Sequence, residues 1–89
     1  MNSKTNWALQ IDPQIFKTLK RFPKQDKERI LEAVKSIQAD PYFGDIQKIK
    51  GEENVWRRRI GSYRIFYEIY TKENAIYVFH AERRTSTTY

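Results

Sequence analysis

This sequence has few of the residues that build disulfide-linked or metal-centred folds. It contains no cysteine and a single histidine, His80. Disulfides and thiolate metal sites are therefore excluded, and so is a metal site with several histidine ligands. No apolar run is long enough to span a membrane, and the N-terminal stretch MNSKTNWALQ lacks the apolar segment of a secretion signal. We therefore expect a cytoplasmic protein without a metal.

Acidic residues are also in the minority. The chain has 11 Asp and Glu residues against 17 Lys and Arg residues, which gives a net charge of +6. A small basic domain often binds nucleic acid or an acidic protein. With 89 residues, of which 39% are hydrophobic, the chain can bury one modest core but not two. We expect residues 1–89 to form a single domain.

Two amphipathic segments predict a pair of helices. Asp12 and Pro13 have the residue types of an N-cap and of a first helical position, and apolar residues follow at helical spacing. A second apolar stripe runs over Lys24–Ala39 and ends at Asp40, because a proline follows. The short turn at Pro23 predicts that the two helices form an antiparallel hairpin.

Alternation of apolar and polar residues predicts the strands. One strand covers Asn6–Ile11, and Val55–Tyr70 (VWRRRIGSYRIFYEIY) alternates on both sides of a Gly-Ser pair that suits a hairpin turn. A last strand covers Ala75–Ala81, whereas Pro41–Asn54 is predicted to be a loop without regular structure. We expect an α+β fold: a small antiparallel sheet of about four strands, in the order βααβββ, with the helix hairpin packed on one face.

Strand alternation places arginines on the face of the sheet that the helices leave open. Arg57 and Arg59 share that face in the first half of the hairpin, and Arg64 lies on it in the second half. Clustered guanidiniums repel one another unless an anion lies among them, so this face predicts a polyanionic partner. The alternative is a solvated sheet face.

Two polar residues fall on the predicted core side of the strands. Arg58 lies on the apolar row of its strand, so it must reach an edge of the sheet or pair with an acid such as Glu68 or Glu32. His80 has a side chain suited to acid–base chemistry. Alternation, however, places it with the apolar side chains of the last strand, and we expect it to be a partly buried structural histidine.

The element order and the residues on it resemble the RelE/ParE superfamily of toxins from type II toxin–antitoxin systems. The matching pieces are DP at Asp40–Pro41, KIKG at Lys48–Gly51, WRRRIGSYRIFYEI at Trp56–Ile69 and YVFHAERR…Y at Tyr77–Tyr89. The resemblance implies a toxin that a cognate antitoxin protein neutralises. RelE-like members are endoribonucleases that cut translated messenger RNA on the ribosome. They use no metal or other cofactor, because the ribose 2′-hydroxyl attacks its own phosphate.

The resemblance also implies which residues act. The arginines of the family fall on Arg57, Arg64 and Arg83, and its C-terminal tyrosine falls on Tyr89. These four residues are the expected catalytic group, and their retention favours the nuclease branch. Two alternatives stay open: a ParE-like inhibitor of DNA gyrase without nuclease activity, and a basic RNA-binding domain that cuts nothing.

The group that takes the proton of the 2′-hydroxyl is left open. Tyr89, Glu82 and Glu68 are the candidates, and Tyr89 could instead stack on a base of the message. Contacts to message or ribosomal RNA are expected from four further basic residues, namely Lys48, Lys50, Arg59 and Arg84.

Overall fold

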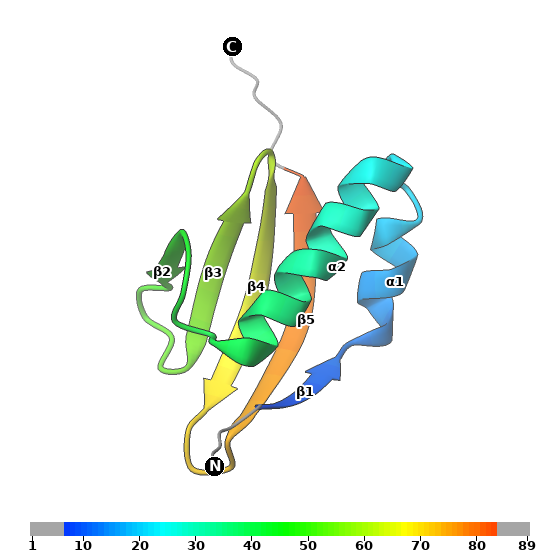
Figure 1. Ribbon diagram of the computed structural model, residues 1–89. Helices are drawn as coiled ribbons and strands as arrows, with labels where there is room; N and C mark the ends of the chain where they lie inside the picture. Colours follow the sequence, from blue (N-terminus) through cyan, green and yellow to red (C-terminus); the bar gives the residue numbers. More distant parts are fainter. Residues whose placement is uncertain (1–6, 84–89) are drawn as a thin grey trace.

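The computed structural model describes residues 7–83, which form two helices and five strands (Figure 1). In chain order these are β1 (Ala8–Ile11), α1 (Pro13–Leu19), α2 (Lys24–Ala39), β2 (Ile46–Lys48), β3 (Val55–Ile60), β4 (Tyr63–Tyr70) and β5 (Ala75–Arg83). The strands form one sheet in the order β1-β5-β4-β3-β2. The α+β class is confirmed.

Both helices begin where the sequence predicts. The Asp12 side chain accepts a hydrogen bond from the backbone N–H of Gln14 at 2.9 Å, which caps α1, and Pro13 follows in the first turn. The second helix covers the predicted range, and its C-cap Asp40 is extended. None of the helices within residues 7–83 is long and apolar enough to cross a membrane. The buried side chains of the two helices are those of Ile15, Leu19, Ile30, Ala33, Val34 and Ile37.

The sheet has one strand more than expected, and it is mixed. The stretch 41–54, predicted to be a loop, contains β2, which pairs antiparallel with β3. This strand has only three residues, too few for alternation to show in a sequence. At the other edge β1 pairs in parallel with β5, so the expected purely antiparallel sheet is wrong. The predicted meander of β3, β4 and β5 is confirmed.

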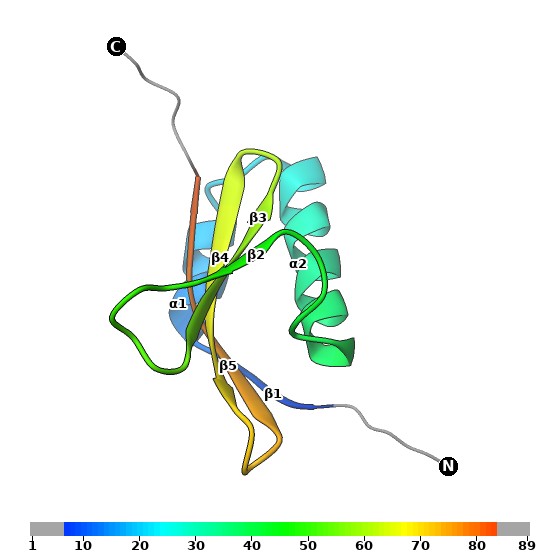
Figure 2. The ribbon, with the colours of Figure 1, turned by 90° about the vertical axis from the view of Figure 1, so that its left-hand side faces the viewer.

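The helices cover one side of the sheet. In Figures 1 and 2, α2 lies across one face and α1 lies beside it, along β5. Within residues 7–83 no helix lies against the opposite face (Figure 2). The predicted apolar row of β4, Ile65, Tyr67 and Ile69, is buried under the helices, and Ile76 and Val78 of β5 join it. The arginine-bearing face is therefore open, as predicted.

A bulge in β5 changes which side chains point to the open face. The register between β4 and β5 shifts between Phe66 and Tyr67, so that Phe66 pairs with His80. The buried side chains on either side of the bulge are Val78 and Ala81, three residues apart instead of two. The extra residue turns His80 away from the helices. The prediction that His80 packs with the apolar residues of β5 is wrong, because alternation does not reveal a bulge.

Candidate functional site: an arginine-rich sheet face

Two rows of side chains cross the open face from strand to strand. The register aligns Gln47, Arg57, Phe66 and His80 in one row. The second row contains Asp45, Arg59, Arg64 and Glu82. We call these eight residues the arginine face. It contains three guanidiniums and two carboxylates, so it keeps a positive charge even when His80 is neutral.

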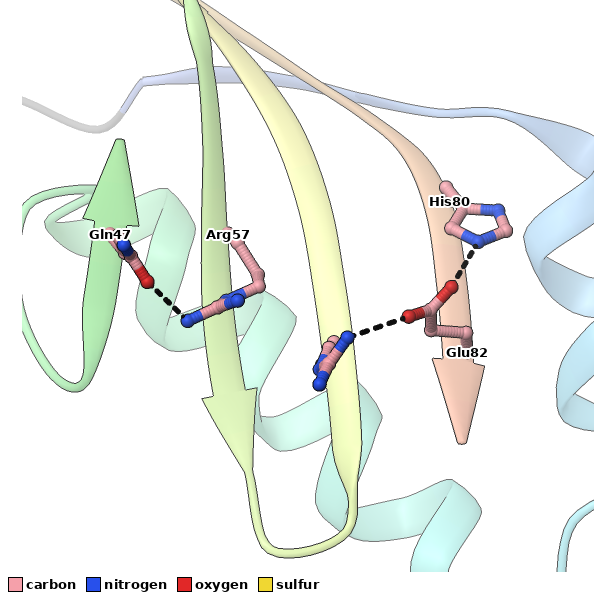
Figure 3. Close-up of polar contacts among 5 residues, drawn as sticks. Gln47, Arg57, His80 and Glu82 are labelled. Atoms are coloured by element: carbon pink, nitrogen blue, oxygen red, sulfur yellow. Dashed lines mark hydrogen bonds and ion pairs between the residues drawn. The ribbon is translucent and has the colours of Figure 1, made fainter. Parts of the chain in front are cut away.

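The edge strand β2 and the residue before it orient two of the arginines. Arg57 donates from Nη2 to the side-chain oxygen of Gln47 (Figure 3). Arg59 donates from Nε to Asp45 Oδ2 at 3.0 Å, and its backbone N–H donates to the Asp45 carbonyl at 2.9 Å. The sequence analysis missed Gln47 and Asp45, because nothing in a three-residue strand marks its partners in advance.

Glu82 connects an arginine and the histidine. Its Oε2 lies 3.2 Å from Arg64 Nη1, and its Oε1 lies 3.0 Å from His80 Nε2 (Figure 3). The ring of His80 also lies against Phe66, with 5.4 Å between the ring centroids. Arg64 is 28% exposed and Glu82 is 37% exposed, so this group is accessible from the open face.

The guanidiniums of Arg57 and Arg64 retain unused hydrogen-bond donors. Among the described residues, Nε of each is buried and has no partner. A guanidinium offers five N–H donors in a planar fork, and the oxygens of a phosphate match that fork. Arg57 donates from one Nη to Gln47 and Arg64 from one Nη to Glu82, so other Nη donors of each are left for a ligand. The arginine face is therefore suited to hold an anion with several oxygens.

Arg83 lies on the other side of the sheet from Arg64. It pairs across the strands with the buried Tyr63, and its Cζ lies 5.9 Å from the centre of the Tyr63 ring. The Tyr63 hydroxyl donates to Asp26 Oδ2 at 2.6 Å, and this hydrogen bond raises the pKa of Tyr63. Of the expected catalytic residues, the structure brings Arg57 and Arg64 together and places Arg83 apart. Tyr89, like Arg84, lies outside the described residues.

The two expected RNA-binding lysines lie at the end of β2 and in the turn that follows. Lys48 pairs with Trp56, so its side chain is on the opposite side of the sheet from Arg57. Its Nζ donates to the carbonyl of Glu52 at 2.6 Å. Lys50 is exposed. Neither lysine therefore belongs to the two rows, whereas Arg59, the third expected contact, does.

Arg58 is held by a hydroxyl group and not by an acid. Its Nη1 donates to Ser36 Oγ of α2 at 3.0 Å. Its guanidinium lies against the backbone of Gly44, where an added Cβ would be 3.0 Å from Cζ and Nε. Of the two alternatives predicted for Arg58, pairing with Glu68 or Glu32 is wrong, because its contacts are Ser36 and Gly44. Alternation placed Arg58 on the correct face, but its partner depends on how α2 crosses the sheet.

Residues 7–83 contain no group of three or more His, Cys, Asp or Glu side chains that could hold a metal ion. The chemistry that this face offers comes from guanidiniums, one imidazole and two carboxylates.

Comparison with known proteins gives consistent matches over nearly the whole chain. A family model described as the ParE toxin of the type II toxin–antitoxin system parDE matches residues 9–85. A predicted toxin, RelE1, of Methanocaldococcus jannaschii is 27% identical over 79 residues, which cover 85% of this chain and 88% of the relative.

Solved structures give the same result. RelE in the archaeal RelE–RelB complex from Pyrococcus horikoshii superposes with a TM-score of 0.79 and 25% identity, over 93% of this chain and 100% of that one. A chain of the toxin–antitoxin complex RelBE2 from Mycobacterium tuberculosis gives a TM-score of 0.78 over 90% of this chain and all of the other. At 15% identity, that second likeness concerns the fold alone.

Proposed function

Because this chain belongs to the ParE toxin family of type II toxin–antitoxin systems, we propose that it acts as a ribosome-dependent endoribonuclease. The observation that carries the proposal is the pair Arg57 and Arg64. They lie on adjacent strands of one open face, and each guanidinium donates only one of its side-chain N–H groups to another described residue. That arrangement suits a phosphodiester that gains negative charge during cleavage.

The proposed chemistry needs no metal. The 2′-hydroxyl of a ribose attacks the adjacent phosphorus, and the bond to the 5′-oxygen breaks, which leaves a cyclic phosphate. Arg57 and Arg64 would stabilise the charge on the phosphate oxygens, because guanidiniums stay protonated. The ribosome would supply the alignment of attacking and leaving oxygens that a small domain cannot impose alone.

Basic residues outside the two rows would bind the surrounding RNA. We assign this role to Lys48 and Lys50, and we assign it also to Arg59, which lies within the second row of the arginine face. Arg83 would meet RNA from the other side of the sheet, so its proposed part in catalysis depends on a substrate that reaches the end of β5. The roles expected for Tyr89 and Arg84 remain proposals.

A cognate antitoxin is the second proposed partner. The RelE proteins of the archaeal complexes from P. horikoshii and from Methanococcus jannaschii were solved with RelB. This chain has a net charge of +6, and its arginine face is open. An acidic antitoxin segment that covers this face would neutralise the toxin.

The second candidate function is inhibition of DNA gyrase without nuclease activity. It is favoured by the matching family model, which is described as the ParE toxin. The two functions differ in what they do to translated messages. A nuclease cuts them inside codons, whereas a gyrase inhibitor leaves them intact and traps gyrase on DNA.

The experiment is expression of the toxin without antitoxin, with messages mapped by primer extension. We expect cuts inside translated codons. The variant Arg64→Ala should cut about a hundredfold more slowly, because one cation that stabilises the transition state is lost. Arg29→Ala is the matched control, since Arg29 lies on α2 and its side chain is 58% exposed. Growth arrest with intact messages and trapped gyrase–DNA complexes would favour the second candidate.

A further inference from the structure

His80 lies where the arginine face meets α1. Its side chain is 49% exposed, and its ring rests against Phe66. Nε2 is 3.0 Å from one oxygen of Glu82, whose other oxygen is 3.2 Å from Arg64 Nη1 (Figure 3). The imidazole is therefore held one carboxylate away from the guanidinium that would bind the scissile phosphate.

The contact with Glu82 determines what the imidazole can do. A carboxylate beside one ring nitrogen favours the tautomer that carries its proton there, so Nε2–H donates to Glu82 and Nδ1 keeps a free lone pair. The same carboxylate stabilises the imidazolium that forms when Nδ1 takes a proton. Arginine cannot serve as a base, because it does not deprotonate. His80 is thus joined to Arg64 through a single carboxylate, that of Glu82.

The imidazole also lines a groove beside α1. The groove, of about 350 Å³, lies between α1 and β5 and is lined by Gln14, Lys17, Thr18, Arg21 and His80. Two of these residues are cations, Lys17 on α1 and Arg21 in the turn after it, and they suit a phosphate of the chain that crosses the arginine face. The charged groups around His80 are therefore Lys17 from α1, Arg21 from the turn after α1, Arg64 from β4 and Glu82 from β5.

We propose that His80 is the general base of the RNA cleavage and that Glu82 is its positioning residue. This inference rests on the proposed endoribonuclease function. Nδ1 of His80 takes the proton of the 2′-hydroxyl while the 2′-oxygen forms its bond to phosphorus. The bond from phosphorus to the 5′-oxygen breaks, and the departing oxygen takes a proton from water. The imidazolium then returns its proton to solvent, and Arg64 stabilises the phosphate throughout.

The first test measures single-turnover cleavage of a ribosome-bound message across pH. The wild-type rate should rise with pH to a plateau, because a base must be neutral to act. His80→Gln should cut at least about a hundredfold more slowly and lose the acidic limb of this profile. Glu82→Gln should keep the acidic limb but shift it to lower pH. The variant loses the carboxylate that stabilises the imidazolium of His80, so the imidazole becomes neutral at a lower pH. Glu28→Gln, on the exposed side of α2, is the matched control and should behave as wild type.

The second test separates a base from an acid. A message with sulfur in place of the 5′-bridging oxygen has a leaving group that needs no proton. With this message, the ratio of the His80→Gln rate to the wild-type rate should be the same as with the normal message. If the His80→Gln rate instead rises to that of wild type, His80 acts as a general acid and the assignment is overturned. Exogenous imidazole should partly restore the cleavage rate of His80→Ala. The thermal unfolding midpoints of the His80 variants should match that of wild type, because the His80 side chain is half exposed.

The failures can be told apart. If wild type cuts and His80→Gln cuts equally fast with the same pH profile, the assignment of His80 is wrong and the endoribonuclease proposal stands. If wild type cuts no message, on the ribosome or free, the proposed function fails and the base assignment fails with it.

Discussion

Tyr67 is a buried polar residue that ties the end of α2 to the sheet. It is fully buried, and its hydroxyl donates to the carbonyl of Pro41 at 2.8 Å. Burial raises the pKa of Tyr67 to about 12, although the nearby Arg58 acts in the opposite direction. A phenol in this environment stays protonated, and its hydrogen bond fixes the chain where it leaves the helix.

We expect Tyr67→Phe to lower the free energy of unfolding by roughly 1 to 3 kcal/mol, because it leaves the buried Pro41 carbonyl without a donor. Chemical denaturation measures the change. Tyr42→Phe is the control, since Tyr42 is 47% exposed and should lose little stability. Equal stability of the two variants would mean that the buried bond contributes nothing.

The same phenol predicts a pH dependence at the alkaline end. The folded pKa of Tyr67, about 12, exceeds its ordinary value of 10.0. Folding therefore favours the protonated form, and this contribution is complete below about pH 10 and is lost as the pH rises through the folded pKa. Unfolding free energies measured across this window should fall for wild type and fall less for Tyr67→Phe. Parallel curves would contradict the assignment.

At the scale of elements, the edge strand β2 depends on a contact between Gly44 and Arg58. Gly44 has a φ of +98°, and a Cβ there would be 3.0 Å from the Arg58 guanidinium. That guanidinium donates a hydrogen bond to Ser36 of α2. Asp45, the next residue, holds Arg59. The position of β2, and with it the orientation of Arg57 and Arg59, thus depends on Arg58, which lies on the helix-covered side of the sheet.

Gly44→Ala should displace the Arg58 guanidinium by a few tenths of an ångström, loosen the start of β2 and increase exchange of the Arg59 amide, which donates to Asp45. The control is Gly51→Ala: Gly51 also has a positive φ, +87°, but its Cβ would meet nothing within 4 Å. Both variants cost backbone strain on the order of 1 to 3 kcal/mol, because alanine rarely adopts a positive φ, so the extra loss in Gly44→Ala reports the Arg58 contact. That extra loss should shrink when Arg58 is replaced by Ala, and its persistence would locate the conflict elsewhere.

At the scale of the whole molecule, one face is covered by helices and the other presents cations. An acidic antitoxin would be attracted to the open face, and complementary charge speeds association. We expect the association rate of toxin with its co-expressed acidic neighbour to fall as salt rises, and the amides of β3 and β4 to become protected from hydrogen exchange.

The matched pair for this prediction is Arg57→Gln against Arg29→Gln. Both remove one positive charge, but only Arg57 lies on the arginine face, so only its loss should slow association markedly. If the association rate does not depend on salt and the arginine face stays as exposed as in the free toxin, the antitoxin must act by another route, such as bulk that blocks the toxin's access to its target.

The sequence by itself determined the features that depend on near neighbours in the chain. The Asp12 cap, the range of α2 and the Gly-Ser hairpin follow from spacing and turn chemistry within a few residues. The open face with Arg57, Arg59 and Arg64 follows as well, because alternation holds along an unbroken strand.

Only the tertiary structure decided how strands meet one another. The three-residue β2 forms by pairing with the edge of β3. Arg58 donates to Ser36 because α2 crosses the sheet at that point. The bulge between β4 and β5 turned His80 onto the open face beside Glu82, while Arg83 fell on the other side, over Tyr63. Periodicity is a property of one segment, whereas register is a property of two, and a shift of one residue moves a side chain to the opposite face.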